Sequence, residues 1–314
     1  MTKMIATRDA YGEALKELGG INEDIVVLDA DLSGSTKTAV FQKEYPHRFF
    51  NVGIAEQNLI GTAAGLATAG KIPFASTFAV FATGRAYEII RNSVAYPKLN
   101  VKIAATHAGL TVGEDGATHQ ALEDISLMRS LPNMVVLCPA DAVETKKCIY
   151  KAAEYKGPVY IRLGRSKVPV ILDESYEFEI GKGVQLKEGN DISLVATGVM
   201  VAKALEAAKI LEEEGISVRV INISTIKPID KDIIIKAAKE TKAIVTVEEH
   251  SIIGGLGSTV AEVLSENCPT IMERIGTMDT FGESGDAEEL LEKYGLGVEN
   301  IVNKAKKLLS KKMD

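Results

Sequence analysis

The chain has 314 residues, of which 46% are hydrophobic and 25% charged, the composition of a soluble globular protein long enough for two ordinary domains. Its net charge of −7 argues against a large nucleic-acid-binding surface, and no uninterrupted apolar run approaches membrane-spanning length. The three cysteines lack metal-ligand spacing and the N-terminus lacks a signal-peptide core, so we expect a cytoplasmic protein.

Strand and helix patterns alternate through the first half of the chain. An amphipathic helix is predicted from residue 6 to Gly20, with Thr7 as its N-cap. Further helices are predicted at 59–70, 85–97, 125–132 and 142–157. Buried strands are predicted at 25–32, 71–77, 101–105, 133–141 and 158–165. This alternation is typical of a parallel sheet with helices on both faces.

The second half repeats the alternation after a break. Between residues 167 and 189 the pattern loosens into charged and glycine-bearing sequence, which predicts a linker. Strands are then predicted at 191–198, 216–224, 243–250 and 270–276, and helices at 201–215 and 257–267. We therefore predict an α/β protein with two doubly wound domains, residues 1–166 and 190–314.

One loop concentrates titratable groups. The segment 105–124 (ATHAGLTVGEDGATHQALED) contains His107 and His119, with Glu114 and Asp115 between them. It is interrupted by three glycines and follows a predicted strand, a common layout for an active site in an open α/β sheet. Solvated or structural histidines would produce the same pattern, so the loop alone leaves both readings open.

Other candidates are weaker when each is considered alone. Glu56 is flanked by apolar residues and marks either a functional carboxylate or a helix start. Phe78 and Phe81 suit core packing or a stacking surface. Arg162 and Arg165 end a predicted strand and suit phosphate binding or ion pairing.

Taken together, the motifs resemble transketolase, and more narrowly the C-terminal subunit of a split transketolase. The segments that carry the resemblance are NVGIAEQNLIGTAAGLA, STFAVF, THAGLTVGEDGATHQALEDISLMRSLPN, PVYIRLGR, EEHSIIGGLGSTVAEVL and TFGESGDAEELLEKYGL. It runs nearly end to end, with residues 1–166 matching the pyrimidine-binding domain and 190–314 the C-terminal domain. It implies transfer of a two-carbon ketol unit between sugar phosphates, as in the pentose phosphate pathway.

The resemblance implies thiamine diphosphate as cofactor. Glu56 matches the glutamate that bonds the aminopyrimidine ring, where it favours the tautomer that takes the C2 proton of the thiazolium. Phe78 and Phe81 match aromatic residues around that ring, and Asp31 matches an acidic residue near the cofactor.

The resemblance also implies a substrate site. His107 and Asp115 match residues that bond the hydroxyls of a ketose donor, and His119 matches a second histidine of that site. His107 and His119 can move protons as the C2–C3 bond breaks and re-forms. The residues that match sugar-phosphate ligands are Arg8, Ser35 and Arg165.

The chain departs from the family pattern in ways that matter. An aromatic residue that is frequent in the family is Gly84 here, and a common loop proline is Ala117. The family's GDG and NN motifs, which bind the diphosphate and its metal on a separate domain, are absent. We therefore expect an N-terminal partner subunit that holds the diphosphate and Mg²⁺, with self-association, as in an α2β2 assembly.

Three alternatives remain open. A 1-deoxyxylulose-5-phosphate synthase-like chain would share the fold and the glutamate, although that family generally lacks a histidine corresponding to His107. A 2-oxoacid dehydrogenase β subunit has similar length but does not suit the paired THAGL and GEDGATHQ pattern. A non-catalytic scaffold would have lost acid–base residues that are all present here.

Overall fold

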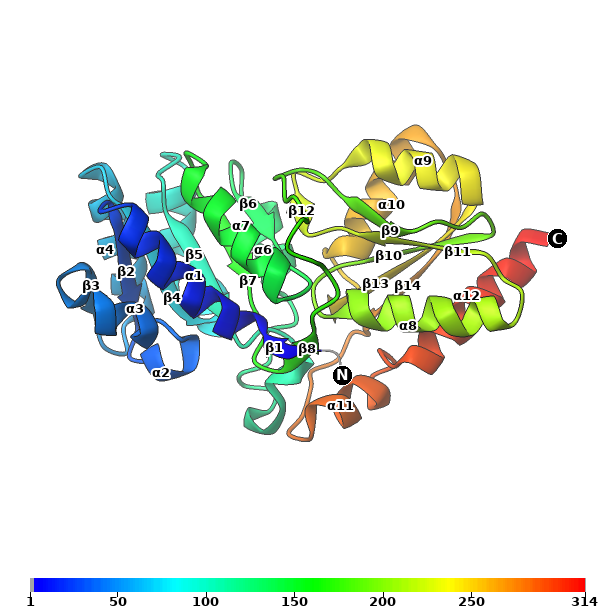
Figure 1. Ribbon diagram of the computed structural model, residues 1–314, viewed down its shortest axis with the longest axis horizontal. Helices are drawn as coiled ribbons and strands as arrows, with labels where there is room; N and C mark the ends of the chain where they lie inside the picture. The colour runs from blue at the N-terminus through cyan, green and yellow to red at the C-terminus, as the bar shows by residue number, and fades with distance from the viewer. Residues whose placement is uncertain (1–2, 314) are drawn as a thin grey trace.

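The structure is a computed structural model that describes residues 3–313 of the chain. Residues 1 and 2 of the predicted first domain and residue 314 of the predicted second domain therefore lie outside the described residues. Two mostly parallel sheets stand side by side with helices packed on them (Figure 1). This confirms the predicted α/β class with two doubly wound domains. We call the elements from β1 to β8 the first domain and those from β9 onward the second domain.

The first domain is built on a seven-stranded sheet. Its strands lie in the order β12 (Thr225–Lys227), β6 (Val135–Leu137), β7 (Val159–Arg162), β5 (Lys102–Thr106), β4 (Ile72–Phe78), β2 (Ile25–Asp29) and β3 (Phe49–Asn51). All neighbours are parallel except β12, which pairs antiparallel with β6. Because parallel strands end on the same side, the segments that follow β2, β4, β5 and β7 meet at one edge of the sheet.

Helices cover both faces of this sheet because each presents an apolar stripe to it. One face is covered by α1 (Thr7–Ile21), α3 (Ala39–Glu44) and α7 (Ala142–Glu154), and the other by α4 (Glu56–Thr68) and α6 (Asp124–Ser130). Leu15 and Ile149 are buried on the first face, and Leu59 and Ile125 on the second. The short helix α2 (Ser33–Thr36) and a 3₁₀ turn (Pro46–Arg48) lie in the connection between β2 and β3.

The start of α1 differs from the prediction. Thr7 is the first residue of the helix, and Ala6 takes the N-cap position without a capping side chain. The Thr7 hydroxyl instead accepts a hydrogen bond from the backbone N–H of Gly164 at 2.7 Å. This bond ties the start of α1 to the segment after β7, so that Arg8 and Arg165 belong to adjoining segments.

The predicted helix over residues 85–97 is irregular in the structure. A π-helical turn spans Phe81–Arg85, a single α-helical turn α5 spans Tyr87–Ile89, and a second π-helical turn spans Ile90–Ala95. A π turn holds more residues than an α turn, so a pattern with a 3.6-residue period does not reveal it. Such turns are rare and frequently lie at functional sites.

The second domain repeats the architecture on a five-stranded sheet. Its strands lie in the order β14 (Ile271–Thr277), β13 (Ala243–Ser251), β10 (Ile192–Ala196), β11 (Val218–Asn222) and β9 (Val184–Lys187), of which only β9 is antiparallel. Its helices are α8 (Met200–Glu213), α9 (Lys231–Thr241), α10 (Leu256–Asn267), α11 (Ala287–Lys293) and α12 (Val298–Met313). Within residues 3–313, no helix is long and apolar enough to cross a bilayer.

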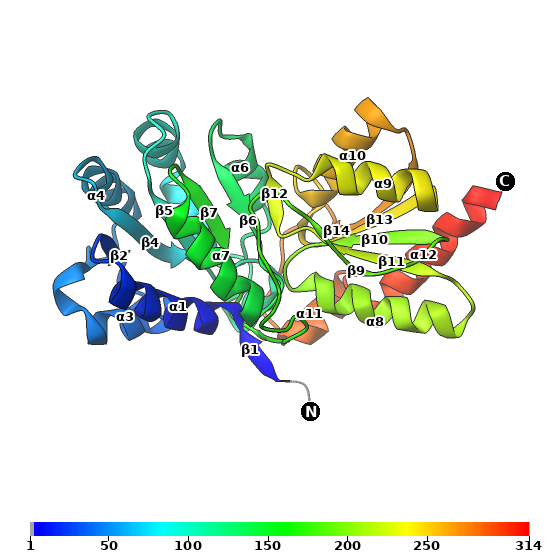
Figure 2. The same ribbon diagram turned by 45° about the horizontal axis from the view of Figure 1, so that its top comes forward.

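The two domains share a strand and a core. β12 follows β11 of the second domain yet pairs with β6 in the first sheet, and it lies between the two sheets in Figure 2. The buried cluster that contains Leu59 and Ile125 continues into α9 and α10. In the predicted linker 167–189, β8 (Lys167–Pro169) pairs with β1 (Met4–Ala6), and β9 joins the second sheet. A continuous apolar core therefore connects the domains.

Candidate active site

Several candidate residues gather at the carboxyl edge of the first sheet. Phe78 is the last residue of β4, His107 directly follows β5, and Arg165 lies three residues after β7. Arg8 lies in the first turn of α1, which Thr7 ties to Gly164. Because these strands are neighbours, the fold brings together residues that are far apart in the sequence.

An aromatic cluster forms the centre of this group. The His107 ring stacks on Phe78 with 3.8 Å between ring centroids and 20° between planes. Phe78 stacks in turn on Phe81 at 5.8 Å, and His119 meets Phe81 edge-on at 5.4 Å. Stacked and edge-on contacts at such distances stabilise ring pairs beyond their area burial. The four rings therefore form an apolar wall with an imidazole at two of its positions.

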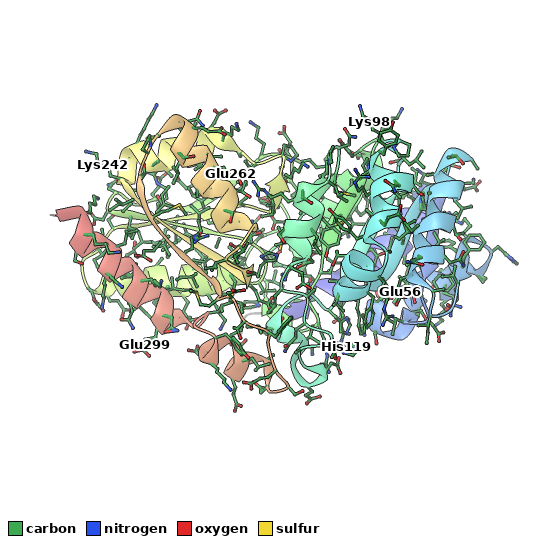
Figure 3. All side chains as sticks on the ribbon, turned by 180° about the vertical axis from the view of Figure 1, so that it is seen from behind. Glu56, Lys98, His119, Lys242, Glu262 and Glu299 are labelled. Atoms are coloured by element: carbon green, nitrogen blue, oxygen red, sulfur yellow. The ribbon has the colours of Figure 1, made fainter. Side chains whose placement is uncertain are left out.

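Glu56 joins this cluster through Arg85, a residue that the sequence reasoning missed. Glu56 is the first residue of α4 and is 6% exposed. Its Oε1 lies 3.0 Å from Nη1 of Arg85, whose guanidinium stands 4.5 Å from the centroid of the Phe81 ring. Figure 3 shows Glu56 and His119 on the same flank of the first domain. The Glu56 carboxylate therefore lies at a helix start, pairs with Arg85 and borders the aromatic cluster.

The signal that could have led to Arg85 is its neighbour Gly84. Gly84 is exposed, and a Cβ built on it would meet nothing within 4 Å, so the edge of the cluster is open at this point. The π-helical turn that spans Phe81–Arg85 returns the Arg85 side chain over the Phe81 ring. A cation over an aromatic face is a favourable contact, and here it covers the open edge.

Arg8 and Arg165 supply positive charge next to His107. Arg8 Nη1 lies 3.0 Å from Nε2 of His107 and donates to the backbone carbonyl of Ser35 at 3.0 Å. Arg8 Nε is buried and has no hydrogen-bond partner among the described residues. Burial is the main cause that lowers the pKa of Arg8, and the charge of Arg165 adds to it. An anion bound beside Arg8 would accept from this unpartnered donor.

The partners of His107 identify its tautomer. Because Arg8 can only donate, Nε2 of His107 accepts, and the ring proton belongs on Nδ1, which lies 2.9 Å from Oγ1 of Thr106. Burial, together with the charges of Arg8 and Arg165, lowers the pKa of His107 to about 3. The geometry therefore describes a neutral imidazole held at both nitrogens.

We expect His107 to remain neutral from about pH 5 to about pH 8, so its Cε1–H resonance should not move in that range in an NMR titration of the labelled chain. The His107→Asn variant identifies the resonance. Because the pKa in the folded chain, about 3, lies below the ordinary value of about 6.5, protonation favours unfolding. The free energy of unfolding should therefore fall as the pH drops below about 6.5. A His107 resonance with a midpoint near about 6.5 would contradict this assignment.

Two acidic candidates lie beside the cluster rather than in it. Asp31 follows β2 with a backbone φ of +65°, and its side chain accepts from Nδ2 of Asn51 at 3.0 Å. Asp115 is exposed at the end of the 3₁₀ turn Leu110–Asp115. Among the described residues, neither carboxylate is hydrogen-bonded or ion-paired to a residue of the aromatic cluster, so their roles stay predictions.

Arg162, by contrast, is an ion-pair residue. Its Nε lies 2.9 and 3.2 Å from the two carboxylate oxygens of Asp124, and Tyr160 donates to the same carboxylate at 2.7 Å. Its Nη2 donates at 2.8 Å to the backbone carbonyl of Glu249 in the second domain. Of the two roles left open by the sequence, the structural one applies to Arg162. Arg165 donates to the backbone carbonyl of Val112 and its Nη2 lies 4.0 Å from a carboxylate oxygen of Glu114.

Comparison with known proteins gives two family matches that together cover most of the chain. Residues 3–170 match the family described as "Transketolase, pyrimidine binding domain". Residues 181–301 match the family described as "Transketolase, C-terminal domain". The two matches follow one another in the same order as the two sheets.

Three known proteins are similar over nearly the whole chain. A Methanocaldococcus jannaschii protein named "Putative transketolase C-terminal section" is 59% identical over 95% of this chain and 94% of its own length. A "6-deoxy-6-sulfo-D-fructose transketolase subunit" of Clostridium sp. is 43% identical over 97% of this chain and 95% of its own. A solved structure titled "Split gene transketolase, inactive beta4 tetramer" is 62% identical, covers 98% of this chain and 99% of its own, and superposes with a TM-score of 0.92.

Proposed function

This chain belongs to the transketolase family as a C-terminal subunit of the split type, and we propose that it transfers a two-carbon ketol unit from a ketose phosphate to an aldose phosphate. The resemblance predicted from the sequence motifs is thereby confirmed. The observation that carries the proposed reaction is a continuous line of contacts, from Glu56 through Arg85 and the two phenylalanine rings to His107 and Arg8. This line offers a carboxylate and aromatic faces at one end and phosphate-binding charge at the other.

The residues of the chain fit one half of thiamine diphosphate. We propose that the buried carboxylate of Glu56 would bond a ring nitrogen of the aminopyrimidine, and that Phe78 and Phe81 would pack around the ring. The bound cofactor would supply a carbon nucleophile that carries the two-carbon unit. Glu56 would hold the proton that it shares with the ring nitrogen. Arg85, which now bonds Oε1 of Glu56, would have to share that oxygen or move aside.

The other half of the cofactor requires a second subunit. Within residues 3–313, no group of three or more His, Cys, Asp or Glu side chains is spaced to hold a metal ion, and the sequence has no GDG motif. We infer that an N-terminal subunit holds the diphosphate and Mg²⁺, in an α2β2 assembly. The names of the similar proteins, which include a C-terminal section, a subunit and a split-gene transketolase, support this inference.

On the sugar side, this chain would bind the donor through charge and hydrogen bonds. Arg8 and Arg165 would hold the terminal phosphate, and His107 and Asp115 would bond the donor hydroxyls. The imidazole of His119 would take up and return a hydroxyl proton as the C2–C3 bond breaks and re-forms. The sulfofructose named for the Clostridium relative also carries a terminal anion, which supports an anion-binding end in this site.

Reconstitution tests the proposal. The chain would be mixed with the N-terminal transketolase subunit of its own organism, thiamine diphosphate and Mg²⁺, and assayed with D-xylulose 5-phosphate as donor and a panel of aldose phosphates as acceptors. We expect ketol transfer from the mixture and none from either subunit alone. Full activity of this chain without a partner would contradict the inference that a second subunit completes the site. Inactivity of a verified complex with every donor, including sulfofructose, would contradict the proposed reaction.

A further inference from the structure

The loop that carries His107 adopts a backbone that is costly unless it is held from outside. His107 has a φ of +57°, and Gly109 and Gly113 both have a φ of +80°. Positive φ is unfavourable for a residue with a side chain, and it persists only where the surroundings fix it. The contacts that hold this loop therefore determine where the imidazole and the carboxylate of Asp115 stand.

Most of these contacts come from the first domain. The N–H of Gly109 donates to the carbonyl of Ala121 at 3.0 Å. Gln120 donates to the carbonyl of Leu110 at 3.2 Å, and Ser166 donates to the carbonyl of Thr111 at 3.0 Å. These neutral bonds pin the loop on the side that faces its own domain.

The second domain supplies a charged contact from the other side. The N–H of Thr111 donates to Oε1 of Glu249, in β13, at 2.6 Å. Glu249 is 3% exposed, and its Oε2 has no hydrogen-bond partner among the described residues. A bond from an N–H to a buried carboxylate is stronger than one between neutral groups. Glu249 therefore makes a strong hydrogen bond to a loop that belongs to the other domain.

The backbone at Gly109 lies close against this carboxylate. A Cβ at Gly109 would lie 2.3 to 2.5 Å from the carboxylate atoms of Glu249, closer than any real contact. The glycine is thus needed both for its positive φ and for the space that the carboxylate fills. The carboxylate thus contacts the loop at two positions, at the space left by Gly109 and at the N–H of Thr111.

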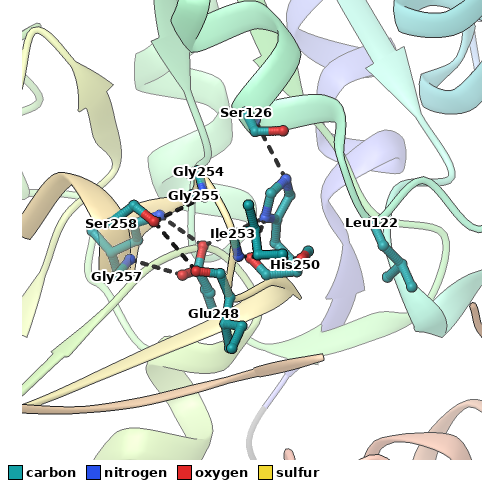
Figure 4. A network of polar contacts seen from close by, with 12 residues as sticks. Leu122, Ser126, Glu248, His250, Ile253, Gly254, Gly255, Gly257 and Ser258 are labelled. Atoms are coloured by element: carbon teal, nitrogen blue, oxygen red, sulfur yellow. Dashed lines mark hydrogen bonds and ion pairs between the residues drawn. The ribbon is translucent and has the colours of Figure 1, made fainter. Parts of the chain in front are cut away.

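Neighbouring residues fix Glu249 in its own strand. Arg162, which is paired with Asp124, donates to the Glu249 carbonyl at 2.8 Å, and its Nη1 lies 3.8 Å from Oε2. Glu248 points to the opposite face of β13 and accepts from the N–H groups of Leu256 and Gly257 at 2.7 and 2.8 Å (Figure 4). Of these two adjacent buried glutamates, Glu248 thus bonds a helix of its own domain, and Glu249 bonds the loop of the candidate active site.

We propose that Glu249 is a positioning residue, through which the second domain holds the loop that presents His107 and Asp115 to the sugar donor. This inference rests on the proposed function for its kinetic consequence, while its structural part does not depend on it. Loss of the carboxylate would free the Thr111 N–H and let the loop relax. A shift of about 1 Å in the groups that orient a substrate can cost about a hundredfold in rate, so even partial relaxation should be measurable.

The test compares Glu249→Ala, Glu249→Gln and the matched control Glu248→Gln in the reconstituted complex. We expect Glu249→Ala to raise the KM for D-xylulose 5-phosphate by about tenfold and to leave the concentration of thiamine diphosphate that gives half-maximal activity unchanged within about twofold. Glu249→Gln keeps a neutral acceptor for Thr111 and should recover part of the loss. Glu248→Gln should lower the Tm without changing the KM, as expected for a purely structural carboxylate.

Amide hydrogen exchange in the chain without its partner gives a second readout. Peptides that cover residues 108–115 should exchange faster in Glu249→Ala and not in Glu248→Gln. Gly109→Ala disrupts the same contact from the side of the loop and should raise the exchange rate of the same peptides. This variant provides the test if Glu249→Ala does not fold. Unchanged exchange in the folded variants, or an unchanged KM in an active complex, would overturn the proposal. An inactive wild-type complex would overturn the proposed function alone, since the exchange result would still decide the role of Glu249.

Discussion

Replacing Glu56 with alanine is expected to lower the rate of ketol transfer by the reconstituted enzyme by about a thousandfold, in the range found when a general acid–base group is removed. The carboxylate is 6% exposed and borders the aromatic cluster, so it is largely screened from bulk water at the place proposed for the ring nitrogen of the cofactor. Glu56→Gln keeps the shape of the side chain and a hydrogen bond but cannot exchange a proton. It should therefore be nearly as inactive as Glu56→Ala.

The measurement is the turnover number at saturating donor, acceptor and cofactor, with assembly followed by size-exclusion chromatography. A suitable control is Glu88→Ala, which removes an exposed carboxylate on α5, one residue after Tyr87. The control should keep the wild-type turnover number. Retention of more than about a tenth of the activity in assembled Glu56→Ala would mean that another group moves the proton, and the proposed role would be wrong.

Glu56→Ala should also affect the isolated chain in a predictable direction. Removing the carboxylate frees the guanidinium of Arg85, which is exposed and can turn to water while it remains near the Phe81 ring. Because an exposed cation needs no buried partner, the loss of stability should be small, about 1 kcal/mol or less. A large loss of activity without a large loss of stability separates a functional carboxylate from a structural one.

The fold could be predicted from the sequence wherever a local pattern determines an element. The segment 25–32 is apolar on both faces, and this alone identifies the buried strand β2 (Ile25–Asp29). β12 was missed because Thr225–Lys227 is only three residues long and depends on a pairing with β6 of the other domain. The π-helical turns were missed because a pattern with a 3.6-residue period does not reveal the extra residue that each π turn holds.

The candidate site divides in the same way. The histidines and acids of the loop 105–124 follow one another along the sequence, so their grouping is visible before folding. Arg85 and Glu249 reach the site only through space, across a π turn and across the domain boundary. Gly84 marks the position next to Arg85, but no spacing in the sequence encodes the contact of Glu249, and the resemblance assigned neither residue because it rests on matched motifs. The sequence and its resemblance therefore named the loop residues, Glu56, the two phenylalanines and the flanking arginines as candidates, and missed two of the groups that this loop and Glu56 contact.

Arg8 provides the second large effect. We expect Arg8→Ala to raise the KM for D-xylulose 5-phosphate by about a hundredfold, while the KM for unphosphorylated D-xylulose changes much less. A hydrogen bond to a charged group contributes about 1.5–3 kcal/mol, and at about 1.4 kcal/mol per factor of ten two such bonds to a phosphate account for a change of this size. The buried Nε of Arg8 has no hydrogen-bond partner among the described residues, so one of its donors is unsatisfied in the chain alone.

The comparison between the two sugars is needed because Arg8 has two tasks. Its Nη1 also bonds Nε2 of His107, so Arg8→Ala should disturb the imidazole and cause some loss with either sugar. The part of the effect that depends on the phosphate is the fold-increase in KM for the phosphorylated sugar divided by the fold-increase for the unphosphorylated one. Arg8→Lys would keep the charge but not the planar fork that suits a phosphate, and we expect an intermediate ratio. Arg91→Ala, which removes an exposed arginine bonded to Asn92, is the matched control and should leave both KM values unchanged.

An equal loss with both sugars would show that Arg8 acts only through His107, and the phosphate site would then have to be sought at Arg165 alone. The two arginines can be separated further, because Arg165 donates to the carbonyl of Val112 and has no bond to His107 among the described residues. Arg165→Ala should therefore raise the KM for the phosphorylated sugar with little effect on the unphosphorylated one. If Arg8 and Arg165 bind the same phosphate, the double variant should lose less than the product of the two single effects, since the second substitution acts on an anion already poorly held.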